Sequence, residues 1–156
     1  MIKTLILIFC LFLPVVSFSG THEDHNEKLT FSYNFATAHR FSNSTVNDGD
    51  GWYERNQFVG VRYHHKENQV IGFAYGTNSY KNQSFILEYE FNNKINDRFD
   101  LGAHLFLASG YRDIVGKIDV LPGIAPYLRV KGPHGVSVKF AAKNFLAYAA
   151  FLEITF

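Results

Sequence analysis

The feature that most constrains this sequence is an alternation of apolar and polar residues with a period of two. It is clearest just after residue 28, where the large apolar residues are Leu29, Phe31, Tyr33 and Phe35. Successive side chains of a β-strand point to opposite faces of the sheet, so this pattern predicts strands with one apolar and one polar face. An amphipathic helix requires a period near 3.6, and the pattern therefore favours an all-β fold.

Eight segments carry this alternation, with turn-forming residues between them. The expected strands cover residues 29–41, 57–65, 70–75, 84–91, 98–108, 118–130, 136–140 and 148–156. Short connections alternate with longer ones, as in small outer-membrane barrels with short periplasmic turns and longer extracellular loops. A soluble lipocalin-like barrel also has eight strands but points its large apolar residues inward. We therefore predict an eight-stranded antiparallel up-and-down transmembrane β-barrel.

The first nineteen residues are predicted to be a cleaved signal peptide. Lys3 gives a positive start, residues 5–16 are apolar, and residues 17–19 have the small-x-small form of a signal-peptidase site. Residues 20–28 would then form a short polar leader, and residues 29–156 the barrel. Cleavage would remove Cys10, the only cysteine, so we expect no disulfide although the compartment would permit one.

Composition narrows the class of protein further. Without Lys3, the chain has 14 basic and 14 acidic residues. It therefore lacks the excess of positive charge that is typical of proteins that bind nucleic acid. Phe and Tyr together supply 25 of 156 residues (16 plus 9), a density that fits the aromatic girdles of outer-membrane barrels. We therefore expect a monomer in the outer-membrane bilayer of a Gram-negative bacterium, with no metal ion or cofactor.

The alternation also divides the predicted lumen into two halves. The periplasmic half holds three acids and three bases, namely Glu88, Glu90, Glu153, Arg62, Arg129 and Lys139. We expect them to pair as a packed plug, because an unpaired buried charge is costly to desolvate. The outer half is lined by small and apolar residues, chiefly Ala36, Ala38, Ala74, Gly76, Ile86, Phe106 and Leu121. These residues either form a cavity for one hydrocarbon chain or only relieve crowding in a narrow barrel.

Polar residues at the outer rim supply the groups that ester acyl transfer needs. Ser79 offers a hydroxyl, His39 a base, and Asn78 with nearby backbone N–H groups the donors for an oxyanion. Asp48, Asp50 and Asp113 are candidates to orient His39. Near the same rim, Arg40, Arg55 and Arg112 either bind phosphates or only balance carboxylates of the loops. The alternative is that His39 and Ser79 are ordinary polar residues of the rim.

The order of these features resembles the lipid A palmitoyltransferase family of Gram-negative outer membranes. The matching pieces are His39-Arg40-Phe41, Tyr53-Glu54-Arg55, Asn78-Ser79-Tyr80, residues 110–113, the run 120–126 and the terminal Phe156. The resemblance spans roughly residues 31–156. It implies a barrel that moves an acyl chain from a phospholipid to lipid A at the outer leaflet, with His39 and Ser79 as catalytic residues.

The sequence departs from that family at several points. Asn78 stands where the family has Asp, the spacing between His39 and the Arg-Phe pair is one residue shorter, and the family's N-terminal amphipathic helix has no counterpart. The position that limits acyl-chain length in the family, a Gly in its best-known members, corresponds to about Glu90. That implies a shallower pocket or an ion pair inside the barrel.

Two other functions stay open. A lipid A deacylase is also a small barrel, but that family carries its His and Ser close together on the last strands, and residues 143–156 contain neither. A non-catalytic barrel that serves adhesion, surface masking or membrane integrity would account for Asn78 and for the missing helix.

Overall fold

The computed structural model describes residues 28–40, 53, 55–112, 119–144 and 146–156. The predicted signal peptide and the leader up to residue 27 lie outside these residues, as do Phe41, Asp48, Asp50, Glu54 and Asp113. Within the described ranges, no helix is long and apolar enough to cross a membrane.

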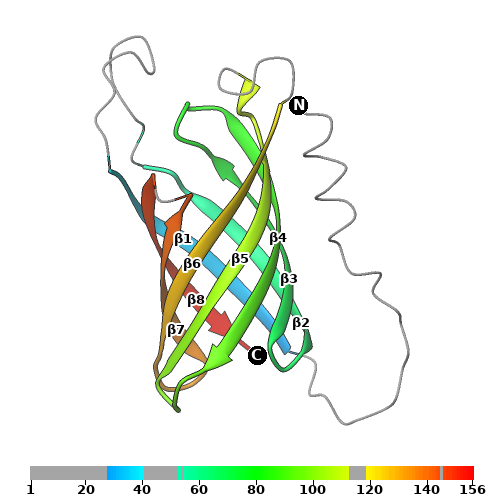
Figure 1. Ribbon diagram of the computed structural model, residues 1–156, viewed down its shortest axis with the longest axis vertical. Helices are drawn as coiled ribbons and strands as arrows, with labels where there is room; N and C mark the ends of the chain where they lie inside the picture. Colours follow the sequence, from blue (N-terminus) through cyan, green and yellow to red (C-terminus); the bar gives the residue numbers. More distant parts are fainter. Residues whose placement is uncertain (1–27, 41–52, 54, 113–118, 145) are drawn as a thin grey trace.

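Eight antiparallel strands close into one barrel (Figure 1). They are β1 (Lys28–His39), β2 (Phe58–Lys66), β3 (Gln69–Thr77), β4 (Gln83–Lys94), β5 (Phe99–Ser109), β6 (Val120–Lys131), β7 (Val136–Lys143) and β8 (Ala147–Thr155). Each strand pairs with the next, and β1 pairs with β8 to close the wall. The predicted fold class is confirmed.

The barrel has two unlike ends. The short connections β2–β3, β4–β5 and β6–β7 lie at one end together with the C-terminus (Figure 1), and we call this the turn end. The opposite end, which carries the β3–β4 tip, is the loop end.

Two strands end three residues later than predicted. β4 continues to Lys94 because its polar last residues pair with β5, and β7 continues to Lys143 because residues 141–143 pair with β8.

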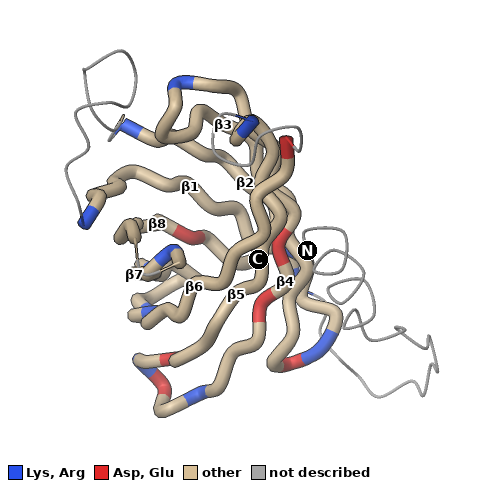
Figure 2. Tube along the Cα trace, turned by 45° about the horizontal axis from the view of Figure 1, so that its top comes forward, with Lys and Arg blue, Asp and Glu red and all other residues tan. Residues whose placement is uncertain are grey.

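The outer surface is apolar, and the turn-end half of the interior is charged, as the alternation predicts. On β1 the large exposed side chains are Leu29, Phe31, Tyr33 and Phe35. Figure 2 shows acidic residues along β4 and β8, and the carboxylates of Glu88, Glu90 and Glu153 are buried. This distribution is the reverse of that in a water-soluble barrel, and it suits a wall surrounded by hydrocarbon.

A β-bulge interrupts the alternation in β1. The pairing of β1 with β8 shifts between Asn34 and Ala36, so that Phe35 is the extra residue and Phe35 and Ala36 are both exposed. The Asn34 amide donates a 3.1 Å hydrogen bond to Thr37 Oγ1 across the bulge. The prediction that Ala36 and Ala38 face the lumen is therefore wrong. The extra residue reverses the parity, so that Thr37 and then His39 face inward instead.

Candidate active site

An apolar cavity of about 160 Å³ occupies the loop-end half of the lumen. Its walls are built mainly from Phe58, Ala74, Ile86, Phe106, Leu121 and Phe151. Towards the turn end it is bounded by Arg62, Glu88 and His104. Ile86, Phe106 and Leu121 are thus placed where the sequence puts them. Their contact with an acyl chain stays a prediction.

Some small inward residues make room for neighbours rather than for a ligand. A Cβ at Gly123 would lie 2.1 Å from the Phe106 ring, so this glycine lets the ring pack inside the barrel. Gly76, predicted to contact the acyl chain, is not among the cavity-lining residues. A Cβ there would lie 1.9 Å from the Gln57 carbonyl oxygen, because β3 approaches the β2 backbone closely at this point.

His39 and Ser79 meet at the mouth of the cavity. The distance between His39 Nε2 and Ser79 Oγ is 2.9 Å. The two residues come from different connections of the barrel, since His39 ends β1 and Ser79 lies in the β3–β4 tip, with β2 between the two strands. The bulge in β1 makes the contact possible, because a regular strand would point His39 outward. This geometry allows a hydroxyl proton to pass between the two side chains.

A second polar side chain, Asn56, also contacts Ser79. Its Nδ2 donates a 2.8 Å hydrogen bond to Ser79 Oγ, and only 5% of Asn56 is exposed. When the Ser79 oxygen accepts from Asn56, its own proton is available to His39. Asn56 is not among the predicted site residues, because it ends a long polar loop in which no pattern sets it apart from its neighbours.

Asn78 organises the tip that carries Ser79. Its Oδ1 accepts hydrogen bonds from the backbone N–H groups of Tyr80 at 2.9 Å and Asn82 at 3.1 Å. Its Nδ2 donates to the Gly110 carbonyl at 2.7 Å, and Asn78 has no exposed surface. Both ends of the amide are therefore engaged, one within the tip and one with the residue that follows β5. The arrangement gives Asn78 a positioning role in the tip, and its role as an oxyanion donor stays a prediction.

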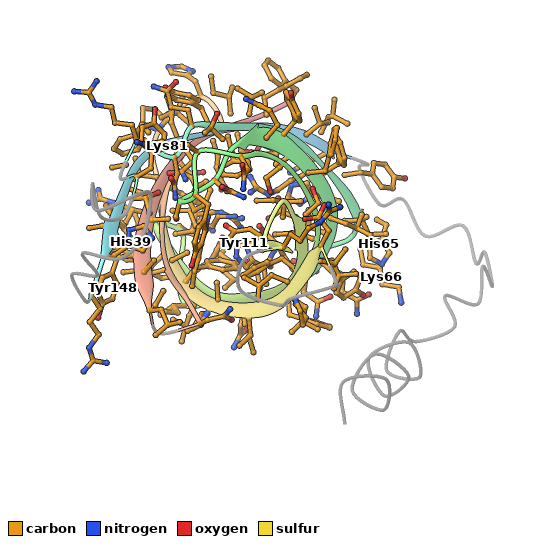
Figure 3. The ribbon with its side chains drawn as sticks, turned by 90° about the horizontal axis from the view of Figure 1, so that it is seen from above. His39, His65, Lys66, Lys81, Tyr111 and Tyr148 are labelled. Atoms are coloured by element: carbon orange, nitrogen blue, oxygen red, sulfur yellow. The ribbon has the colours of Figure 1, made fainter. Side chains whose placement is uncertain are left out.

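Two tyrosines lie over the cavity. Figure 3 looks into the barrel from the loop end and shows Tyr111 above the lumen, with His39 near its edge. The Tyr80 and Tyr111 rings meet edge to face with centroids 6.0 Å apart. Burial, and secondarily the neighbouring Tyr80, raise the pKa of Tyr111 to about 12. The Tyr111 hydroxyl therefore stays neutral at physiological pH and can donate a hydrogen bond to a ligand that enters from above.

The arginines predicted to bind phosphate lie at the rim and not in the cavity. Arg40, Arg55 and Arg112 are all exposed, and none of them lines the cavity. Arg40 follows β1 directly, and its backbone N–H donates to the Leu146 carbonyl at 2.8 Å. Phosphate binding by these residues stays a prediction.

The predicted plug of charges is present below the cavity. Arg62 lies 2.7 Å from Glu88 and 3.0 Å from Glu153. Arg129 lies 2.9 Å from Glu90 and 2.7 Å from Glu153. Lys139 pairs with both Glu90 and Glu153. Glu90 does not line the cavity, so the position corresponding to the family's chain-length residue lies inside the plug, and Glu88 borders the cavity instead.

Two plug carboxylates and the neighbouring His104 together have the composition of a metal site. The ligand atoms of Glu88, Glu90 and His104 lie within 4.8 Å of one another. Arg62 and Lys139 already contact these carboxylates, and their positive charges oppose a cation at the same place. The arrangement therefore serves the ion-pair network better than a metal ion.

Comparisons with known proteins bear on the fold. No family model matches the chain, and no curated protein matches it. A solved structure from work on the de novo design of transmembrane β-barrels aligns with a TM-score of 0.58, covering 83% of this chain and 94% of that one. The two sequences are 9% identical, so the likeness concerns the fold alone. The chain is a small, closed, eight-stranded antiparallel β-barrel that resembles transmembrane barrels.

Proposed function

We propose that this barrel lies in the outer membrane of a Gram-negative bacterium and transfers an acyl chain from a phospholipid to lipid A. The observation that carries the proposal is the 2.9 Å contact between His39 and Ser79 at the mouth of an apolar cavity. A Ser–His pair supplies a nucleophile and its base. An apolar cavity inside a membrane barrel suits one hydrocarbon chain.

The proposed reaction has two steps. In the first, Ser79 Oγ gives its proton to His39 Nε2 and attacks the ester carbonyl of the phospholipid. The lysophospholipid then leaves with that proton, and the acyl group stays on Ser79. In the second, a hydroxyl group of lipid A gives its proton to His39 and attacks the acyl-serine, and the proton returns to Ser79. Asn56, which already contacts Ser79 Oγ, is the proposed donor to the oxyanion.

The stretch of wall where β6 and β7 are least paired is the proposed lateral route for the lipid. β6 and β7 pair only over residues 127–131 and 137–141. Nearer the loop end they are joined through Ile124, which exchanges 2.9 Å hydrogen bonds with Asn144. Pro122 and Pro126 have no N–H to donate to a neighbouring strand. An apolar hollow of about 520 Å³ borders this stretch, lined by residues that include Pro126, Ala141 and Ala149.

Substitution of the pair tests the proposal. His39→Ala and Ser79→Ala should each lower the rate of lipid A acylation by at least about 100-fold, since a positioned base contributes roughly 10²–10⁴-fold. The measurement is mass spectrometry of lipid A from a Gram-negative host that expresses each variant. His65→Ala is the matched control, because His65 lies at the turn end, hydrogen-bonded to Gln69 at 3.1 Å, and it should keep full activity.

Two other results would decide against acyl transfer. Release of lysophospholipid and fatty acid without any change in lipid A would make the pair a hydrolase that uses water as acceptor. Identical lipids with and without the folded wild-type protein would leave the non-catalytic barrel as the better interpretation. Heat-modifiable migration on a gel establishes that each variant is folded before its activity is compared.

A further inference from the structure

Lys143 lies in register with His39 across the barrel wall. It is the last residue of β7 and pairs with Ala147 of β8, which in turn pairs with His39 of β1. Lys143, Ala147 and His39 all line the cavity. Neighbouring strands lie about 4.8 Å apart, so the Cα atoms of Lys143 and His39 are separated by about 10 Å. The lysine therefore borders the space in which His39 and Ser79 act.

The ammonium group of Lys143 lies against aromatic rings instead of a carboxylate. Its Nζ is 5.5 Å from the centroid of Phe58 and 5.2 Å from that of Phe151, and both rings are almost fully buried. Among the described residues Lys143 forms no ion pair, and its ammonium group contacts the faces of these two rings. Such contacts hold an ammonium group in place but do not neutralise it.

The other inward charges balance one another. The four acids Glu88, Glu90, Asp100 and Glu153 pair with the four bases Arg62, Arg129, Lys131 and Lys139. Within the described part of the lumen, Lys143 thus adds one positive charge that this network does not offset. A positive charge beside an apolar cavity favours a ligand that brings a negative one.

We propose that Lys143 is the anion-binding residue of the cavity and that its ligand is an acyl lipid with an oxyanion near the head of the chain. The inference rests on the proposed function and narrows its acyl donor to an anionic lipid. The oxyanion is a phosphate or a carboxylate, since both accept charge-assisted hydrogen bonds from an ammonium group. The alkyl chain would fill the cavity while the oxyanion contacts Nζ near Ser79.

A binding experiment tests this without any turnover. The protein is folded in micelles of a neutral maltoside detergent and titrated separately with dodecyl phosphate, dodecanoate and dodecanol. Binding is followed through the amide NMR signals of Ala74, Ser79 and Ala147, which lie around the cavity. The variants are Lys143→Met and Lys143→Arg, with Lys81→Met as the control for loss of an exposed positive charge at the same rim.

The wild-type protein should bind the two anions at least about tenfold more tightly than dodecanol, because hydrogen bonds to charged groups are the stronger ones. Lys143→Met should lose this preference while it still binds dodecanol. Lys143→Arg and Lys81→Met should keep it. Tighter binding of dodecyl phosphate than of dodecanoate would assign the oxyanion to a lipid phosphate, and the reverse order to a fatty-acid carboxylate; either order supports Lys143 as the site.

Two results would overturn the inference. Equal affinity of the wild-type protein for dodecanol and both anions would show that the cavity does not select negative charge. An unchanged preference in folded Lys143→Met would show that another group selects it. Neither result depends on acyl transfer, so the inference can fail while His39→Ala and Ser79→Ala still abolish activity. Conversely, a wild-type protein that prefers anions but does not acylate lipid A would contradict the proposed function and leave the inference about Lys143 intact.

Discussion

At the scale of single residues, two of the three plug carboxylates, Glu90 and Glu153, are each bound by cations from three strands. Glu90 contacts Lys139, Arg129 and Arg62, and neither Glu90 nor Lys139 has exposed surface. Glu90→Leu and Lys139→Met should each lower the free energy of unfolding by roughly 3–5 kcal/mol, because each leaves a buried charge without its partner. The measurement is denaturant unfolding of the protein in detergent.

The double variant provides the internal check on that estimate. Glu90→Leu with Lys139→Met should lose less than the sum of the two single losses, since removal of both partners leaves less uncompensated charge. Lys66→Met, which removes an exposed lysine at the turn end, should change stability little. Unchanged stability in both single variants would mean that the plug does not contribute to folding.

At the scale of elements, the bulge in β1 decides which way His39 points. Five peptide units separate Asn34 from His39, an odd number, so a regular strand that buries Asn34 would expose His39. Deletion of Phe35, the extra residue, should give a regular strand that still points His39 inward. The deletion variant is therefore expected to assemble and to keep the lipid A modification, measured as for the point variants.

Deletion of Phe73 is the contrasting variant. β3 pairs with β4 without any register shift, so loss of one residue there reverses the faces of the strand on one side of the deletion. It should prevent assembly or displace Ser79. If deletion of Phe35 instead abolishes activity in a folded barrel, then the inward direction of the His39 side chain does not follow from the bulge alone.

Strand β1 shows which features of the fold could be predicted from the sequence and which could not. Alternation was sufficient to predict eight strands and the inward charges, because most of each strand keeps strict period two. It could not reveal the bulge, since one extra residue between Asn34 and Ala36 leaves no mark in composition. Asn56 could not be predicted as a site residue for a different reason. Its contact with Ser79 joins the β1–β2 and β3–β4 connections, and the alternation within strands does not indicate which connections lie close together. His39 and Ser79 were found through their chemistry and the family resemblance.

At the scale of the whole molecule, the apolar belt should show the energetics of a lipid-facing surface. Leu87 is 54% exposed near the middle of β4. Leu87→Arg should lower the free energy of unfolding in phospholipid vesicles by about 2–4 kcal/mol, the cost of an arginine at the bilayer midplane. Gln83→Arg, exposed at the loop end of the same strand, should cost only about 0–1 kcal/mol. Equal losses would contradict a membrane-spanning wall.

The plug also has a consequence in electrical terms. Its six charged side chains are buried, and its central members Glu90 and Lys139 have no exposed surface, so they leave no continuous water path along the barrel axis. A hydrated ion that entered from either end would have to displace paired charges to move further. We therefore expect the barrel to conduct no ions, so that a membrane crowded with its copies would keep its electrical resistance.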